Sequence, residues 1–256
     1  MESISDEQML VSFDIETGGL FDDENPSQRP EVFCAVTVEM FSVGTGEFLF
    51  QGRREWIPSP GLEDPSPMSL EQIKQLAEYL CTITWRGGRV FGWNVVGFDM
   101  RVLYQHLRED YPTLAAQVKL VALECVDPMF NFFMHKGFPV SLNAVAQVMA
   151  KDFVKSGSGG DMISKWEGGT SKDRRAVVAY CVRDTDVAAT VLASMQKAGE
   201  IKWLTKLGKI GLWRPDDESL ISMPLRCSMQ LQDPDNSWMS TRGKPLNKNA
   251  FIGWTQ

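Results

Sequence analysis

Two acidic residues, separated by a single position, follow an apolar and β-prone stretch near the beginning of the chain. The stretch ends at Phe13, Asp14-Ile15-Glu16 comes next, and Gly18-Gly19 follows shortly after. Residues i and i+2 of a strand share a face, so Asp14 and Glu16 are predicted to project together from the carboxyl end of a strand over residues 9–17. Adjacent carboxylates repel each other unless a cation lies between them. The pattern therefore predicts oxygen ligands for a divalent cation such as magnesium or manganese, although solvated acidic pairs at surface turns read the same way.

Asp99 is a third acidic position beside a predicted element. It follows the apolar segment 89–93, which reads as a strand, and residues 100–103 continue at helical spacing. Asp99 is therefore predicted to open a helix just after a strand.

Asp184 lies in a long helical pattern that begins at Ser171, an expected N-cap, and runs to Ala198. Tyr180 precedes Asp184 by four residues, so the two side chains share a helix face. That face also carries valines, and burying a phenol and a carboxylate among them is costly unless something satisfies them. A metal ion and a bound water would do so.

Three segments in this order resemble the exonuclease motifs of the DEDD superfamily. They are Asp14-Ile15-Glu16, Gly92-Trp93-Asn94-Val95-Val96-Gly97-Phe98-Asp99 and Tyr180-Cys181-Val182-Arg183-Asp184. The tyrosine four residues before the last aspartate is typical of the DEDDy branch. Within that branch the segments are most similar to the 3′→5′ proofreading domain of family B DNA polymerases. The resemblance spans roughly residues 9 to 198.

The resemblance implies a two-metal-ion hydrolase of phosphodiester bonds with a defined set of site residues. The implied catalytic residues are Asp14, Glu16, Asp99, Tyr180 and Asp184, and the four carboxylates would hold two Mg²⁺ or Mn²⁺ ions. Tyr180 would orient the attacking water. The implied substrate-binding residues are Thr17, Gly18, Asn94 and Phe98. Asn94 would position the terminal nucleotide or Asp99, and Phe98 is expected to pack in the core or to stack on a base.

Composition fits an enzyme with one good core, because 43% of the 256 residues are hydrophobic. No apolar run reaches the length of a membrane span, so we expect no membrane partner. Residues 1–8 are acidic and do not resemble a signal peptide, which favours a cytoplasmic protein. The five cysteines are widely spaced and favour buried free thiols, and two isolated histidines argue against a zinc hydrolase or a serine triad.

The net charge of −7 is unusual for a protein that binds nucleic acid. An exonuclease that grips only the last few nucleotides of a single strand needs little basic surface, since metal ions cancel much of the local charge. Basic groups that remain available lie in three places. They are Arg53-Arg54, which reads as a solvated face; Lys172, Arg174, Arg175 and Arg183; and Lys202, Lys206, Lys209 and Arg214.

The order of elements predicts an α/β domain over residues 1–200. Strands are expected at 9–17, 32–43, 46–51, 89–93 and 120–127, with helices at 69–84, from 99, at 141–151 and at 171–198. The resemblance implies the ribonuclease H-like fold, a five-stranded mixed sheet flanked by helices. The glycine-rich segment 157–169 reads as a flexible connection or a lid. Residues 201–256 are predicted to form a C-terminal extension that packs on the main domain through its tryptophans.

The resulting prediction is a 3′→5′ exonuclease that releases nucleoside 5′-monophosphates from the 3′ end of single-stranded DNA. The same site would serve an exoribonuclease, since carboxylates and metal ions do not distinguish the sugars. A non-catalytic nucleic-acid-binding or polymerase-docking subunit is a third reading. It is disfavoured because such a subunit has no need for every carboxylate and the tyrosine. A replication or repair protein is the expected protein partner.

Overall fold

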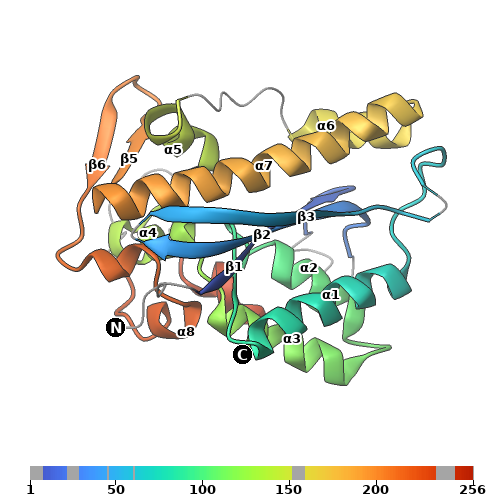
Figure 1. Cartoon of the computed structure of the whole chain (residues 1–256), viewed down its shortest axis with the longest axis horizontal. Coiled ribbons are helices and arrows are strands. Elements are labelled where there is room, and N and C mark those ends of the chain that lie inside the picture. The colour runs from blue at the N-terminus through green and yellow to red at the C-terminus, as the bar shows by residue number, and fades with distance from the viewer. Residues whose placement is uncertain are drawn as a thin grey trace.

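The computed structural model describes residues 8–21, 29–44, 46–59, 61–151, 159–234 and 246–255. Helices lie on both faces of a central mixed sheet (Figure 1). The four strands of the sheet are β1 (Met9–Thr17), β2 (Val32–Gly44), β3 (Glu47–Trp56) and β4 (Arg89–Phe91). Their order is β3-β2-β1-β4, with β1 antiparallel to β2 and parallel to β4. The predicted meander of the first three strands is confirmed.

The sheet holds four strands rather than the predicted five. Residues 120–127 were expected to form the fifth strand, but most of them belong to α3 (Pro112–Glu124). Pro112 starts that helix and the following residues are strong helix formers. Only Val126 occupies the fifth position, as a single bridge parallel to Phe91. A short apolar run does not distinguish a buried strand from a buried helix, which is why this prediction was wrong.

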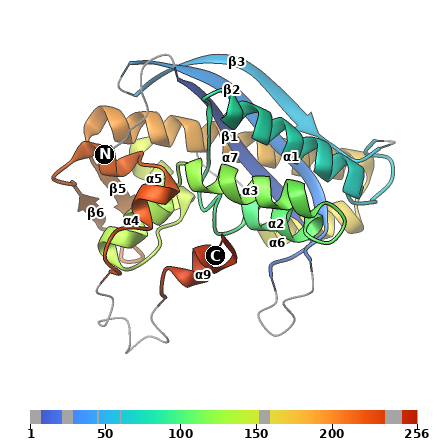
Figure 2. The same cartoon turned by 90° about the horizontal axis from the view of Figure 1, so that it is seen from below.

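Alternate residues of β1 face two different cores. Val11, Phe13 and Ile15 contribute to the core formed with α1 (Leu70–Trp85), α2 (Asp99–Leu107) and α3. Leu10 faces the other core, formed with α7 (Ser171–Ala198), where Ser12 Oγ also donates to the carbonyl of Thr185. Figure 2 shows α1, α2 and α3 together on one face of the sheet, with α7 behind it. Because Asp14 and Glu16 follow in the same alternation, they lie on the α7 face.

Local sequence signals located several helix boundaries correctly. Ser69 caps α1 in a capping box with Gln72, and Ser141 caps α5 (Leu142–Met149) by accepting from the N–H of Ala144. Helix α7 begins at Ser171 as predicted, although its N-cap is Thr170. Among the helices that were not predicted are α3, α4 (Pro128–Lys136) and α6 (Gly159–Glu167).

Helix α6 replaces most of the segment that was interpreted as a flexible connection. Trp166 is fully buried, stacks on Phe33 with ring centroids 5.0 Å apart, and donates from its indole to the carbonyl of Pro65. The contacts that hold α6 come from residues far away in sequence, so glycine density alone was misleading. Gly157 and Ser158 lie outside the described residues.

The described part of the C-terminal extension packs on the first 200 residues. It contains the hairpin of β5 (Ile201–Leu204) and β6 (Ile210–Trp213), and the short helices α8 (Leu225–Ser228) and α9 (Asn249–Ile252). Two 3₁₀ turns, η1 (Glu218–Ile221) and η3 (Gly253–Thr255), complete it. Trp213, Leu225 and Ile252 are buried in the two cores next to α7 and α3. None of the described helices combines the length and apolarity needed to cross a membrane.

Candidate active site

Asp14 and Glu16 lie at the carboxyl end of β1, where the strand runs beyond its neighbour β4. Pairing between β1 and β4 ends at Ser12 and Phe91, so the last residues of β1 have no parallel neighbour there. In open α/β sheets, ligands bind outside the carboxyl ends of the strands, where neighbouring strands continue in opposite directions along the sheet order. This is the edge at which the sequence predicted the two carboxylates.

Asp99 fills the gap beside the end of β1. Its Oδ1 accepts a hydrogen bond of 2.8 Å from the main-chain N–H of Ile15, the residue between Asp14 and Glu16. Asp99 is also 4% exposed and is the first residue of α2. Burial, and then the Asp14 carboxylate, raise the pKa of Asp99 well above its usual range. The first two motifs therefore meet, and their carboxylates crowd each other.

Helix α7 brings a thiol to the same place. One ligand atom from each of Asp14, Glu16 and Cys181 fits within a group no more than 4.8 Å across. Cys181 Sγ donates to the carbonyl of Asp14 at 3.3 Å. Burial, and then the thiol of Cys34 and the Asp14 carboxylate, raise the pKa of Cys181, so its thiol stays protonated. A protonated thiol is a poor ligand for a hard cation, which leaves the carboxylates as ligands.

From the sequence, Cys181 was named within the third motif and counted among the buried thiols, but it was given no role in the site. The signal that could have found it is its position three residues before Asp184, on nearly the same helix face. Asp184 and Tyr180 flank Cys181 on α7, where Tyr180 is 8% exposed and Asp184 is half-buried. The 4.8 Å group does not include Asp99 or Asp184. The position of Asp184 as the fourth metal ligand therefore stays a prediction.

The turn between β4 and α2 is shaped by glycines and by a left-handed asparagine. A Cβ on Gly92 would come within 2.7 Å of the carbonyl oxygen of Phe13, and one on Gly97 within 2.3 Å of Asn94 Oδ1. Asn94 has a φ of 63°. Its Oδ1 is buried and accepts no hydrogen bond from the residues that the structure describes. An amide in this state is suited to receive a donor from a ligand.

Asp127 holds this turn in place and was read from sequence only as the end of a strand. Its Oδ1 accepts from the N–H groups of Asn94 and Phe130, and its Oδ2 accepts from the N–H of Val96, each at 3.1 Å. The same residue caps α4. Burial raises the pKa of Asp127 to about 6, although backbone hydrogen bonds to Phe130, Val96 and Asn94 oppose that shift. Asp127 thus connects α4 to the turn that carries Asn94 and leads to Asp99.

The remaining predicted contact residues are engaged within the protein. Thr17 Oγ1 donates to the carbonyl of Gly19 at 2.7 Å, and the N–H of Gly18 donates to the carbonyl of Glu31 at 2.9 Å. Gly18 therefore has only its main-chain carbonyl left for a substrate. Phe98 packs at the edge of the core, edge-to-face with Phe21 at 5.7 Å.

Several basic residues that were considered from the sequence to be available for nucleic acid form hydrogen bonds or ion pairs within the protein. Arg174 is 5% exposed and its guanidinium donates to four main-chain carbonyls, those of Leu62, Glu63, Trp166 and Gly169. It connects α7 to α6 and to the loop before α1, so it is not a phosphate contact. Arg53 pairs with Asp186 at 2.7 Å, and Arg175 pairs with Glu55.

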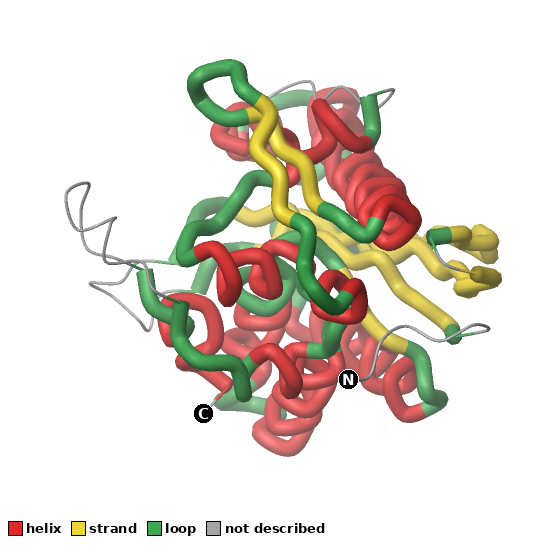
Figure 3. Tube along the Cα trace, turned by 90° about the vertical axis from the view of Figure 1, so that its left-hand side faces the viewer, coloured by secondary structure: helices red, strands yellow, loops and turns green. Residues whose placement is uncertain are grey.

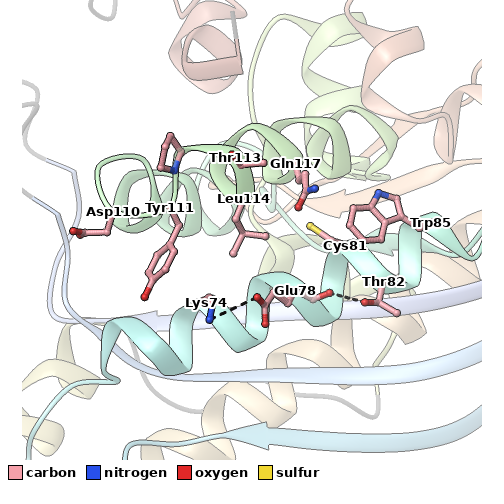
Figure 4. Close-up of a pocket in the computed structure, with 11 residues that line it drawn as sticks. Lys74, Glu78, Cys81, Thr82, Trp85, Asp110, Tyr111, Thr113, Leu114 and Gln117 are labelled. Carbon is pink, nitrogen blue, oxygen red and sulfur yellow. Dashed lines mark hydrogen bonds and ion pairs between the residues drawn. The ribbon is translucent and has the colours of Figure 1, made fainter.

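A pocket of about 570 Å³ lies elsewhere, between α1 and α3 on the opposite face of the sheet (Figure 4). Its walls include Trp85, Tyr111 and Lys74, and Lys74 pairs with Glu71 and Glu78. None of the predicted site residues lines it. The pocket is therefore separate from the carboxylate site.

No protein-family model and no curated protein sequence matches the chain. Solved structures of E. coli exonuclease I are similar to it at low identity, among them a zinc-bound complex with single-stranded DNA, the apo form and a complex with a dA16 oligonucleotide. The first two are 10% identical, with a TM-score of 0.39, and the third is 11% identical with a TM-score of 0.37. The matches cover 75% of this chain, but the chain spans only about two fifths of the exonuclease I chains (41% and 42% for the first two). Similarity at this level does not establish a shared activity.

Proposed function

We propose that the chain is a metal-dependent 3′→5′ exonuclease that releases nucleoside 5′-monophosphates from single-stranded DNA. One observation carries the proposal. Asp14 and Glu16 project from one face at the end of β1, and the buried Asp99 carboxylate binds the peptide N–H between them. Three carboxylates crowded at the edge of a sheet are a donor set for Mg²⁺ or Mn²⁺.

The residues fit such a metal centre on electrostatic grounds. The Asp14 carboxylate raises the pKa of Asp99 beyond the effect of burial, so the metal-free site carries repulsion that a cation would relieve. When bound, divalent ions would supply a water of lowered pKa and neutralise charge on the reacting phosphate. Asp14, Glu16, Asp99 and Asp184 are the proposed ligands.

The other site residues would position the substrate and the water. Tyr180 would orient the attacking water from α7, one turn before Asp184. Asn94 would bind the terminal nucleotide through its buried Oδ1. Thr17, Gly18 and Phe98 would contact that nucleotide from the sides. On the motif resemblance, Tyr180 supports an assignment to the DEDDy branch of the DEDD superfamily, with most similarity to family B proofreading domains.

The test is digestion of 5′-labelled single-stranded DNA, RNA and duplex DNA with Mg²⁺ or Mn²⁺, with products resolved by length. We expect a ladder that shortens from the 3′ end, strongest on single-stranded DNA and abolished by a chelator. Endonucleolytic fragments, or cleavage that persists with the chelator, would refute the proposal. A ladder on RNA alone would make the chain an exoribonuclease with the same site.

A further inference from the structure

One end of the molecule is basic, although the whole chain has a net charge of −7. We call this region the basic end and define it as residues 128–151 and 201–214, which include α4, α5 and the β5–β6 hairpin. These two ranges contain no aspartate or glutamate, although Glu200 and Asp216-Asp217-Glu218 flank the second range. The basic side chains of the two ranges are Lys136, Lys151, Lys202, Lys206, Lys209 and Arg214.

The hairpin has one packed face and one exposed face. Trp203 and Trp213 pack inward, with ring centroids 5.0 and 5.7 Å from that of Phe132. Toward solvent, Leu207 is 85% exposed and Ile210 is 63% exposed. Figure 3 shows the loop of the hairpin projecting beyond the neighbouring helices. The inner face fixes the hairpin to the domain, so the outer face is presented as a stable surface.

The basic residues of the hairpin differ in their partners. At its base, Lys202 and Arg214 both pair with Glu200. At its tip, Lys206 and Lys209 are exposed, and neither has an ion pair within the part of the chain that the structure describes. Uncompensated positive charge therefore collects at the tip, next to the exposed Leu207.

The basic end is connected to the candidate active site through α7 and through a contact of Trp93. The hairpin directly follows α7, and about 21 Å of helix separates Asp184 from Ala198 at 1.5 Å per residue. The indole of Trp93, the neighbour of Asn94, donates to the carbonyl of Val140 at 2.9 Å in the basic end. A strand whose 3′ end lies among the carboxylates could therefore reach the hairpin after several nucleotides.

We propose that the basic end binds the 5′-ward part of a single-stranded nucleic acid whose 3′ end occupies the candidate active site. Lys206 and Lys209 would contact phosphates, and Leu207 and Ile210 would contact bases. This inference rests on the proposed exonuclease function. A polyanion is the occupant that the charge favours, because Lys206 and Lys209 present positive charge at the hairpin tip in a chain whose net charge is −7. A nucleic acid is favoured over an acidic protein because the proposed function already puts the 3′ end of a single strand at the carboxylate site.

The test compares binding of a long and a short labelled single strand in Ca²⁺, by fluorescence anisotropy. Folds that bind single strands cover about 4 to about 16 nucleotides, so the short strand has about 4 nucleotides and the long strand about 16. The test variant is Lys206→Gln with Lys209→Gln. The control is Arg86→Gln with Arg108→Gln, which makes the same change in net charge at the ends of α1 and α2.

The measured quantity is the ratio of the affinity for the long strand to the affinity for the short strand. We expect this ratio to be about tenfold smaller in the test variant than in the wild type. Loss of two phosphate contacts should also lower the salt dependence, the slope of log K against log[salt], by about 1.4, since each single-strand contact contributes about 0.7. The control should keep the wild-type slope.

The inference fails if the test variant matches the control, if the affinity of the wild type does not depend on length, or if polyglutamate competes as well as the DNA does. The proposed function fails separately, if the wild type in Mn²⁺ cleaves neither strand.

Discussion

The main-chain N–H of Ile15 donates to Oδ1 of Asp99 at 2.8 Å, between the two carboxylates of β1. This bond fixes the start of α2 against the end of β1. Burial, and then the Asp14 carboxylate, raise the pKa of Asp99. The position is therefore both structurally anchored and electrostatically strained when no cation is present.

Asp99→Asn should separate these two roles. The amide oxygen can still accept from Ile15, and the change removes a buried charge beside Asp14, so the metal-free melting temperature should stay the same or rise. Turnover and Mn²⁺ affinity should fall by more than about 100-fold, beyond the 10- to 100-fold typical of residues that only support a ligand. Calorimetric Mn²⁺ titration and thermal melts check this, with Asp110→Asn on the opposite face as the charge-matched control. An Asp99→Asn protein that binds Mn²⁺ normally would remove Asp99 from the ligand set.

The metal-free protein should become more stable as the pH falls from about 6 to about 4. Burial raises the pKa of Asp127 to about 6 from 3.8, and it raises the pKa of Asp99 as well, so the folded state holds these protons more tightly than the unfolded chain. For Asp127 alone the gain is on the order of 3 kcal/mol, complete near pH 4 and absent above pH 6. Two groups of residues oppose this gain. The carboxylates with lowered pKa, such as those of Asp173 and Asp217, weaken the fold as the pH approaches 4 and below, and burial lowers the pKa of His106 and His135, which costs stability below pH 6.5. Urea unfolding in a chelator measures the trend, and stability that is flat or falls over this range would contradict it.

Asp127→Ser should distinguish the helix cap from the support of the turn. Serine can still cap α4 through the N–H of Phe130, but it is too short to hold Asn94 and Val96. We expect a modest loss of stability together with an increase of about 10- to 100-fold in the Mn²⁺ concentration needed for activity. Ser141→Ala removes a cap of the same kind from α5 and should lower stability by about 1 kcal/mol without changing the metal requirement. Equal metal requirements in the two variants would show that Asp127 acts only on the fold.

Features encoded by neighbouring residues could be predicted, and features decided by distant contacts could not. The strand at Met9–Thr17 and the caps at Ser69 and Ser141 follow from periodicity and short-range hydrogen bonds. The burial of Trp166 depends on Phe33, more than a hundred residues away, so no local pattern reports it. Asp127 appeared as an ordinary residue at the end of a strand because its partners come from a turn over thirty residues earlier.

Motif spacing located the acidic residues on their elements without giving their distances. It predicted that Asp14 and Glu16 share a face and that Asp99 opens a helix, and the structure has both. It did not indicate that Cys181 would lie within the carboxylate group. It also counted Arg174 as available for nucleic acid, because a sequence cannot show that a guanidinium is surrounded by main-chain carbonyls.

Arg174→Met should destabilise the protein without changing how salt affects DNA binding. The substitution keeps an unbranched apolar stem but leaves four main-chain carbonyls, two of them in buried hydrogen bonds, without their donor, at a cost of at least about 3 kcal/mol. Arg175→Met, next along α7, removes an exposed ion pair to Glu55 and should cost less than about 1 kcal/mol. Urea unfolding and anisotropy titrations at several salt concentrations measure both effects. A stable Arg174→Met protein with a reduced salt slope would restore Arg174 as a phosphate contact.

Tyr180→Phe should lower turnover while leaving substrate affinity unchanged. The ring packs in the core beside α7 and is retained, so only the hydroxyl that is proposed to orient the water is lost. We expect single-turnover rates to fall by roughly 10- to 1000-fold, the range for losing an oriented catalytic group. Asp184→Asn should cost more, because it removes charge from the proposed metal site one turn away. Single-turnover rates in Mn²⁺ and DNA affinity in Ca²⁺ test this order for both variants. If Tyr180→Phe is fully active while Asp184→Asn is inactive, Tyr180 is a packing residue and the water must be oriented by another group.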